Sequence, residues 1–179
     1  TFSSQTGAPS SLYLSVDDMG LTVAEAAQVS GVSLDSVNGI LTFQSTPSLS
    51  NMSSLLVSNG ELILENGGTF DDSSVSLSAS VFKPTGTVSV TNGGSFTLND
   101  TSSIVLQGDT ALDQSGDVFW PSLDLNGNNL FAAHVSNMYC CMHQAGGLTI
   151  RNGETITIPF GNFQVCLLYT SPSPRDLST

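Results

Sequence analysis

The alternation of apolar and small polar residues between Val88 and Leu106 is the feature that most constrains how this chain can fold. Three short runs lie in this stretch, and in each of them the apolar side chains are separated by a single residue. A period of two is typical of a β-strand with one buried face. The runs are separated by Asn92-Gly93-Gly94 and by residues 99–102, which are rich in residue types that form tight turns. The stretch therefore predicts three strands joined by two turns, and an all-β chain.

A phrase of one apolar residue, one polar residue and Asn-Gly occurs three times, as Val57–Gly60, Val90–Gly93 and Ile150–Gly153. The intervals between the copies are unequal, so the sequence suggests internal repetition without fixing a period. Two architectures fit. One is a parallel β-solenoid of the right-handed β-helix type, in which each strand stacks on its counterpart one coil later. The other is an antiparallel β-sandwich with Asn-Gly hairpins. The short strands, 10% charged residues and 7% aromatic residues favour the solenoid.

Residues 1–165 are predicted to form a single β-rich domain or fragment. Two segments depart from the strand pattern. Thr22 and Glu25 match a capping box among alanines that favour helix, so we expect a short helix near residues 22–30. Residues 109–144 contain apolar clusters that are too irregular for the same coil. We expect them to form an insertion or a corner loop packed on the stack.

The charge balance restricts the possible partners. The chain has 3 Lys and Arg residues against 15 Asp and Glu residues, which gives a net charge of −12. So few basic residues cannot build a phosphate-binding surface, which argues against nucleic acid and anionic membranes and disfavours polyanionic polysaccharides. No apolar run approaches the roughly 18 residues of a membrane span. Because the sequence starts without Met or a leader pattern, we expect a processed secreted protein or an internal fragment.

The stretch from Val57 to Leu106 resembles passenger segments of bacterial autotransporter and adhesin β-helices, through the phrase NGGSFTL at residues 92–98. This resemblance covers about fifty residues. It implies a β-helical fold and a location outside the cell or at the cell surface. It implies no functional residue.

The segment from Cys166 to Asp176 resembles the translated sequence of a transposase-based sequencing adapter, which it matches at every residue. We therefore expect residues 166–179 to be a non-native tail, and the native sequence to be cut near Val165. This interpretation removes Cys166 and Arg175 from functional arguments. The net charge is unchanged by it, because the tail contains one Arg and one Asp.

Asp124, Asn126 and Asn128 place oxygen atoms at alternate positions of one turn, as calcium-binding loops do. The turn departs from the EF-hand pattern, since Gly127 stands at the fourth position and Val135 at the twelfth. The sequence predicts a calcium site here, with a plain turn as the other interpretation.

Two further groups of residues have side chains that could bind a metal or act in catalysis. His134, Cys140, Cys141, Met142 and His143 have ligand atoms that suit copper or zinc, although their spacing matches no common zinc motif. Buried packing of the cysteines, or a disulfide from one of them to a segment outside this chain, are the alternatives. Aspartates at positions 17–18, 71–72, 109, 113 and 117 could supply the carboxylate pair of a glycoside hydrolase, or they could be polar turn residues.

These features predict a non-enzymatic structural or adhesion segment of a larger extracellular or cell-surface protein, with glycans or cell-surface molecules as partners. Two alternatives remain. One is a fragment of a carbohydrate-active β-helix enzyme. The other is a calcium-stabilised glycan-binding module.

Overall fold

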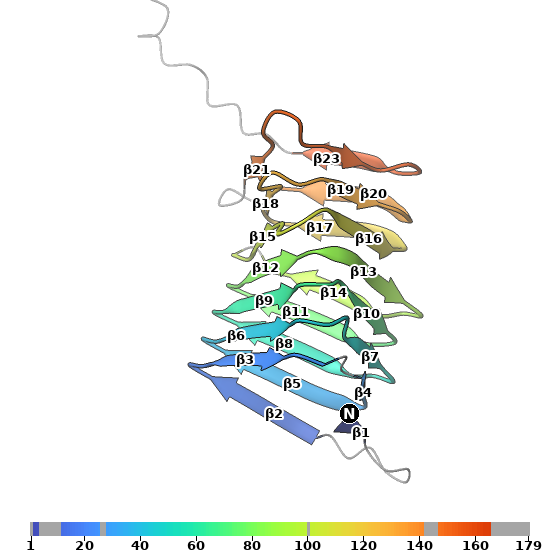
Figure 1. Ribbon diagram of the computed structural model, residues 1–179. Coiled ribbons are helices and arrows are strands. Elements are labelled where there is room, and N and C mark those ends of the chain that lie inside the picture. Colours follow the sequence, from blue (N-terminus) through green and yellow to red (C-terminus); the bar gives the residue numbers. More distant parts are fainter. Residues whose placement is uncertain (1, 4–11, 26–27, 100, 142–146, 166–179) are drawn as a thin grey trace, which may run out of the picture.

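The computed structural model describes residues 2–3, 12–25, 28–99, 101–141 and 147–165. The chain winds into a parallel β-solenoid whose coils stack in the order of the sequence (Figure 1). Every pairing between strands in these residues is parallel. The prediction of an all-β parallel β-solenoid is confirmed, and the antiparallel β-sandwich is excluded.

Each complete coil contributes one strand to each of three faces. The first face contains β2 (Leu12–Asp17), β5 (Val32–Val37), β8 (Ser54–Ser58), β11 (Ser74–Ser78) and β14 (Ser95–Leu98), followed by β17 (Gly116–Trp120), β20 (Val135–Cys140) and β23 (Asn162–Val165). The second contains β3 (Gly20–Val23), β6 (Ile40–Phe43), β9 (Glu61–Leu64), β12 (Val81–Pro84), β15 (Ser103–Val105), β18 (Leu123–Asp124) and β21 (Leu148–Thr149). The third contains β1 (Phe2–Ser3), β4 (Gln28–Ser30), β7 (Ser48–Ser50), β10 (Gly68–Asp71), β13 (Gly86–Thr91), β16 (Thr110–Gln114), β19 (Leu130–Ala132) and β22 (Ile156–Thr157).

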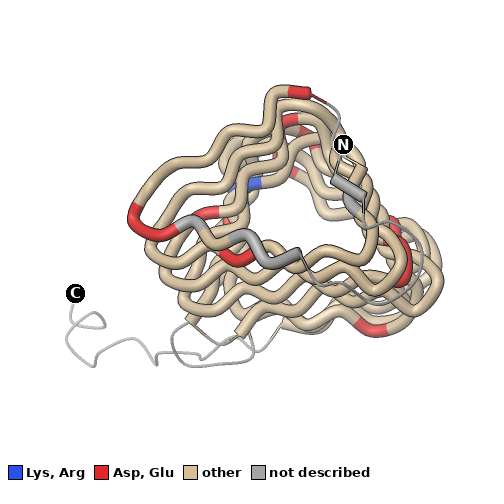
Figure 2. Tube along the Cα trace, turned by 90° about the horizontal axis from the view of Figure 1, so that it is seen from below, with Lys and Arg blue, Asp and Glu red and all other residues tan. Residues whose placement is uncertain are grey.

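Viewed along its axis, the solenoid has a roughly triangular outline, with several Asp and Glu residues at the corners (Figure 2). The corner between the first and second faces repeats one backbone conformation from coil to coil. Residues with positive φ stand at this corner in four successive coils: Asp18, Asn38, Asn59 and Ala79. Asp and Asn tolerate this left-handed conformation better than other side chains, which explains why turn residues recur there.

The core consists of ladders of apolar side chains that stack along the solenoid axis. On the second face, one ladder runs through equivalent positions of all seven strands: Leu21, Leu41, Leu62, Phe82, Ile104, Leu123 and Leu148. The five inner members are fully or almost fully buried. Each coil therefore covers the apolar residues of its neighbours, which is how solenoids acquire stability from adjacent repeats.

Buried hydroxyl groups connect coils at the corner between the first and second faces. Ser80 Oγ accepts a hydrogen bond from the backbone N–H of Gly60 at 3.2 Å and lies 3.0 Å from the carbonyl oxygen of Val57. Both partners belong to the preceding coil. A buried hydroxyl that is hydrogen-bonded in this way avoids the cost of an unpaired polar group.

Two predictions about local structure differ from what is observed. The helix predicted near residues 22–30 is not confirmed: Thr22 and Val23 belong to β3, residues 28–30 form β4, and residues 26–27 lie outside the described residues. Pairing of β3 with β6 and of β4 with β7 takes precedence over local helix propensity.

No helix in the described part of the chain has the length and hydrophobicity that a membrane span requires.

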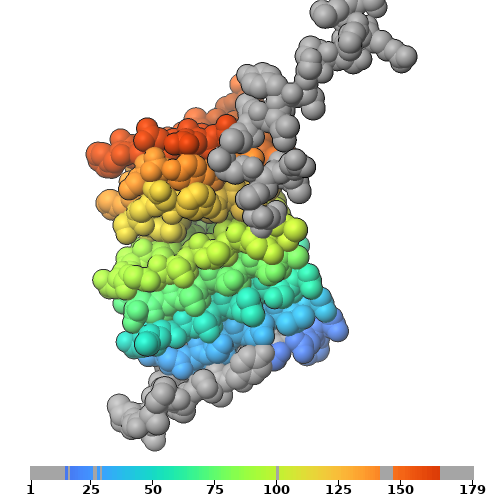
Figure 3. Space-filling view, turned by 180° about the vertical axis from the view of Figure 1, so that it is seen from behind, coloured from blue at the N-terminus to red at the C-terminus, as the bar shows by residue number. Residues whose placement is uncertain are grey.

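The second difference concerns residues 109–144, which we expected to form an insertion or a corner loop packed on the stack. In the structure, β16 and β19 of this segment pair in register with each other and with neighbouring coils. The apolar cluster around Trp120 is β17, with Val118 and Trp120 buried in the core. The described coils form successive layers in the space-filling view (Figure 3). Residues 142–146 and the tail at 166–179 lie outside the described residues.

Candidate functional site

The first face of the solenoid is interrupted between β14 and β17. β14 is the last strand of a five-stranded sheet that continues back to β2, and β17 is the first strand of a separate three-stranded sheet with β20 and β23. The other two faces remain paired at this level, through β15 with β18 and β16 with β19. The two coils therefore separate on one face only, and the edges of β14 and β17 face each other across the gap.

A register shift accompanies this interruption. Gly116 of β17 pairs with Val135 of β20, whereas Asp117 pairs with Asn137, so Ser136 is an extra residue on β20. Such a bulge bends the strand that carries it and increases local twist. The bulge lies at the start of the three-stranded sheet, where the first face resumes after the gap.

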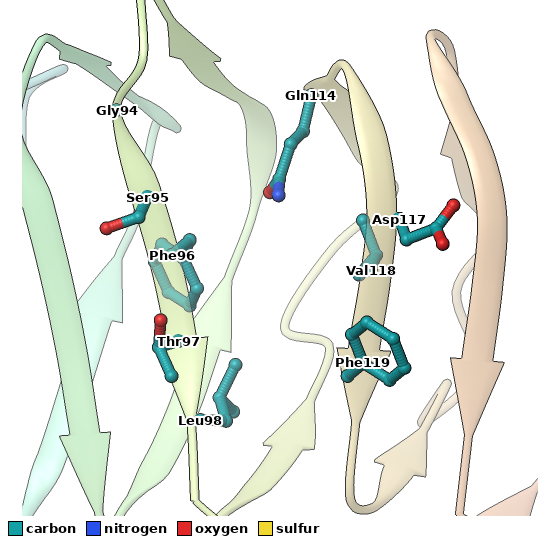
Figure 4. Close-up of a pocket in the computed structure, with 9 residues that line it drawn as sticks. All are labelled: Gly94, Ser95, Phe96, Thr97, Leu98, Gln114, Asp117, Val118 and Phe119. Atoms are coloured by element: carbon teal, nitrogen blue, oxygen red, sulfur yellow. The ribbon is translucent and has the colours of Figure 1, made fainter.

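A cavity of about 260 Å³ lies between the two strand edges (Figure 4). Residues of β14 line one side, residues of β17 line the other, and Gln114 reaches toward the space from the end of β16. We call this cavity the cleft. Its lining consists of Gly94, Ser95, Phe96, Thr97, Leu98, Gln114, Asp117, Val118 and Phe119. Apolar and polar side chains are thus mixed in its wall, as in many small-ligand sites.

The outer surface beside the cleft carries an aromatic stack. Phe119 of β17 and Tyr139 of β20 are paired in the sheet, and their rings stack with centroids 4.6 Å apart and planes 7° apart. The side chain of Phe119 is 63% exposed. Tyr139 covers one face of the Phe119 ring. Because Phe119 also lines the cleft, its other face is available on the side of β14.

A row of polar side chains runs parallel to this stack. The Asn137 amide donates a hydrogen bond of 2.8 Å to Asp117 Oδ1, and Asn162 in turn donates one of 3.2 Å to Asn137 Oδ1. The row begins at the cleft with a carboxylate and continues across the three-stranded sheet. Hydrogen bonds within the row fix the position of the Asp117 side chain.

The predicted calcium ligands lie on one turn, where the Asp124 carboxylate and the side-chain NH2 groups of Asn126 and Asn128 already have partners. Both carboxylate oxygens of Asp124 accept hydrogen bonds from the Arg151 guanidinium, at 2.7 and 3.2 Å, and Oδ1 also accepts the N–H of Asn126. The side-chain amides of Asn126 and Asn128 donate to the Leu106 carbonyl oxygen, one coil earlier, at 3.0 and 3.3 Å. Calcium binding at this turn stays a prediction.

Arg151 also influences the ionisation of the carboxylates around it. Its side-chain hydrogen bond holds the pKa of Asp124 below the usual range of an aspartate. The pKa of Glu154 is lowered first by the hydrogen bond from the backbone N–H of Arg151, and also by that from Gly127. Arg151 therefore supplies the positive charge that pairs with the carboxylates of Asp124 and Glu154.

The other candidate carboxylates occupy separate places on the solenoid. Asp71 accepts hydrogen bonds from Thr91 and Asn92, whereas Asp109 accepts the backbone and side-chain N–H groups of Asn129. Asp113 lies 2.6 Å from His134 Nδ1. Each of these three carboxylates therefore contacts polar groups of the next coil.

The cysteines predicted as possible ligands are buried at the end of β20. Cys140 and Cys141 are bonded to each other by a disulfide. His143 and Met142 lie outside the described residues. Among the described residues, no group of three or more His, Cys, Asp or Glu side chains is arranged to hold a metal ion.

Sequence reasoning did not identify the cleft. Its one local signal is the pair of aromatic residues Phe119 and Trp120, which alternate outward and inward on β17. The interruption of the sheet itself has no local signature, because both β14 and β17 have ordinary strand patterns.

The fold and this site define a parallel β-solenoid with an amphipathic cleft in one face. No family model, no curated protein and no solved structure matches the chain.

Proposed function

We propose that this chain is a non-enzymatic structural segment of a larger extracellular surface protein. In this role the solenoid is a rigid spacer, and its outer faces are available to glycans or cell-surface molecules. The observation that supports the proposal best is the apolar ladder of the second face, which passes through every coil from Leu21 to Leu148 without interruption. The adhesin-like phrase at residues 92–98 supports the extracellular location.

A continuous ladder favours stiffness for a physical reason. Close-packed side chains have few alternative arrangements, so a coil cannot tilt without opening voids next to its neighbours. Leu62 illustrates this, because it is fully buried between Leu41 and Phe82 of the adjacent coils. A spacer also needs a polar outer surface that stays in contact with water. In this chain Ser, Thr and Asn provide most of that polarity, and charged residues provide little of it.

The spacer role is tested by measuring the distance between spin labels at the two ends. Met19 and Phe160 are 67% and 85% exposed and lie in the first and last described coils, so labels can be attached there as cysteines in a background with Cys166→Ser. With strands about 4.8 Å apart, the labels should be separated by roughly 30–40 Å, with a single narrow distribution. Leu62→Ala should broaden the distribution, whereas Leu56→Ala, at an exposed position, should not.

A broad distribution of distances between the labels in the chain with the unmodified ladder would contradict a rigid spacer.

The non-enzymatic part of the proposal has its own test. The purified chain is incubated with neutral polysaccharides, and newly formed reducing ends are measured. Release of reducing ends would instead support the carbohydrate-active enzyme.

A further inference from the structure

We propose that the cleft between β14 and β17 binds a neutral saccharide, with one sugar ring packed against the free face of Phe119. This inference concerns a binding site and goes beyond the spacer role. The two proposals are independent of each other. The solenoid could be stiff and bind no saccharide, or it could bind a saccharide and still bend, so each proposal can fail without the other.

The aromatic platform is the first reason. Phe119 is 63% exposed and lies in the wall of the cleft. Tyr139 supports the ring from one side at 4.6 Å and holds it in a fixed orientation. A pyranose ring has a face of C–H groups with partial positive charge, and the face of an aromatic ring is negative. The available face of Phe119 therefore suits a sugar.

The polar groups of the cleft are the second reason. Within the described residues, the side chains of Ser95, Thr97 and Gln114 make no hydrogen bond, although all three line the cleft. Hydroxyl and amide groups both donate and accept hydrogen bonds, as sugar hydroxyls do. Asp117 adds a carboxylate whose Oδ1 is held by Asn137. A saccharide would satisfy these groups while covering Phe119.

A second hollow provides a contrast. It has a volume of about 410 Å³ and lies on the third face, where exposed Phe131 is surrounded by polar residues. There most of the polar groups have partners: Asp109 accepts from Asn129, and Asn129 accepts from the backbone and hydroxyl of Thr155. The cleft differs in its amide group: among the described residues the side chain of Gln114 makes no hydrogen bond, whereas the Asn129 amide of the hollow is bonded on both sides.

Charge restricts the ligand to a neutral one. The cleft lining contains Asp117 and neither Lys nor Arg, in a chain with a net charge of −12. Uronic acids, sialic acids and sulfated sugars would be repelled by this field. A cation offers no acceptor for the NH2 group of Gln114 or for the hydroxyl hydrogens of Ser95 and Thr97, whereas a sugar hydroxyl both donates and accepts hydrogen bonds.

An extended peptide fits the gap less well than a sugar ring. A strand inserted between β14 and β17 would need these two strands to lie about 9–10 Å apart along their whole length. The pairings of β15 with β18 and of β16 with β19 hold the same two coils at single-strand spacing on both other faces. The gap is therefore a local opening on one face, and a compact ring suits it.

The test is a titration of the ¹⁵N-labelled chain with cellotriose, maltotriose, mannotriose and N,N′,N″-triacetylchitotriose, followed by NMR chemical shifts. We expect at least one of these neutral sugars to shift the amide signals of residues 95–98 and 117–119, with a Kd on the order of 1 mM. Phe119→Ala should weaken binding at least tenfold, and Phe119→Tyr should preserve it. Phe160→Ala, which removes an exposed Phe outside the cleft, should leave the affinity unchanged.

Gln114→Ala provides a second variant that leaves the aromatic stack intact, and we expect it to weaken binding severalfold. Far-UV circular dichroism verifies that each variant keeps the β-fold. The proposal is overturned if none of the four sugars shifts these signals, or if Phe119→Ala binds as well as the parent chain. Displacement of the sugar by a peptide copying residues 86–98 would assign the cleft to a strand, and a steep loss of affinity with salt would assign it to a cation. Both outcomes would also overturn the proposal.

Discussion

Gly60 lies directly against Gly39 of the preceding coil: a Cβ atom at Gly60 would be 2.1 Å from the carbonyl oxygen of Gly39. The Asn-Gly phrase to which Gly60 belongs occurs three times, but the glycines serve different purposes. Gly93 and Gly153 have φ angles of 84° and 91°, and a Cβ atom at either would meet nothing within 4 Å. Gly60 is needed for close approach, whereas the other two are needed for backbone conformation.

We predict that Gly60→Ala destabilises the solenoid more than Gly93→Ala. The new methyl group at residue 60 would collide with backbone atoms of Gly39, and two coils would have to move apart. We expect a loss of about 2–4 kcal/mol in the free energy of unfolding, measured by urea denaturation. Gly93→Ala should cost about 1–2 kcal/mol through left-handed strain alone. Equal losses in the two variants would contradict the close approach at Gly60.

Strand positions were predictable where both alternation and turn residues were present. The alternating runs expected at residues 88–90, 96–98 and 104–106 overlap β13, β14 and β15. Local patterns sufficed here because a period of two and a turn with positive φ at Asn92 both have signatures in the sequence. The capping box at Thr22 was misleading, because its local preference for helix is outweighed by pairing with residues 40–43.

The cleft and the Arg151 contact were not predictable, because both depend on which residues meet across coils. Arg151 and Asp124 are 27 residues apart, a longer interval than the 20 to 22 residues that separate many other cross-coil partners. Without a strict period, the sequence does not say which turn residues face each other. The interruption between β14 and β17 is likewise a property of two coils together, and neither strand reveals it alone.

We predict that Ser36→Ala stabilises the chain. Ser36 is fully buried, and among the described residues its hydroxyl has no hydrogen-bond partner. It stands next to Val57 in a ladder that is otherwise apolar. Removing an unpaired buried hydroxyl should raise the free energy of unfolding by about 1 kcal/mol, which urea denaturation can detect.

Ser80→Ala is the matched control for this variant. Ser80 is also buried, but its hydroxyl contacts the Gly60 N–H and the Val57 carbonyl. Its removal leaves backbone groups unpaired and should lower stability by about 1–3 kcal/mol. If both serine variants were destabilised alike, the Ser36 hydroxyl would have to be hydrogen-bonded in solution.

We predict that the stabilising effect of Arg151 depends on pH. The pKa of Asp124 is lowered in the folded chain by its hydrogen bond to Arg151. A lowered pKa contributes stability that is present above the unfolded value of about 3.9 and is lost as pH falls through the folded value. Arg151→Met should therefore lower the melting temperature at pH 7 and have little effect at pH values below the folded pKa.

The ionisation behind this effect can be followed directly. The Asp124 carboxyl carbon is titrated by NMR in the parent chain and in Arg151→Met, and its pKa should rise in the variant. If the difference in melting temperature between the parent chain and Arg151→Met persisted unchanged at low pH, Arg151 would stabilise the turn through packing instead of charge.

Calcium should compete with Arg151 if the turn of Asp124, Asn126 and Asn128 binds it. Both oxygens of Asp124 contact the guanidinium, so an entering ion must displace a charge-assisted pair. We therefore expect about 1 mM calcium to raise the melting temperature of Arg151→Met more than that of the parent chain. Adding Asp124→Asn to Arg151→Met should abolish the rise, because a calcium site depends on carboxylate charge. A calcium-induced rise that survives Asp124→Asn would place the ion elsewhere on the chain.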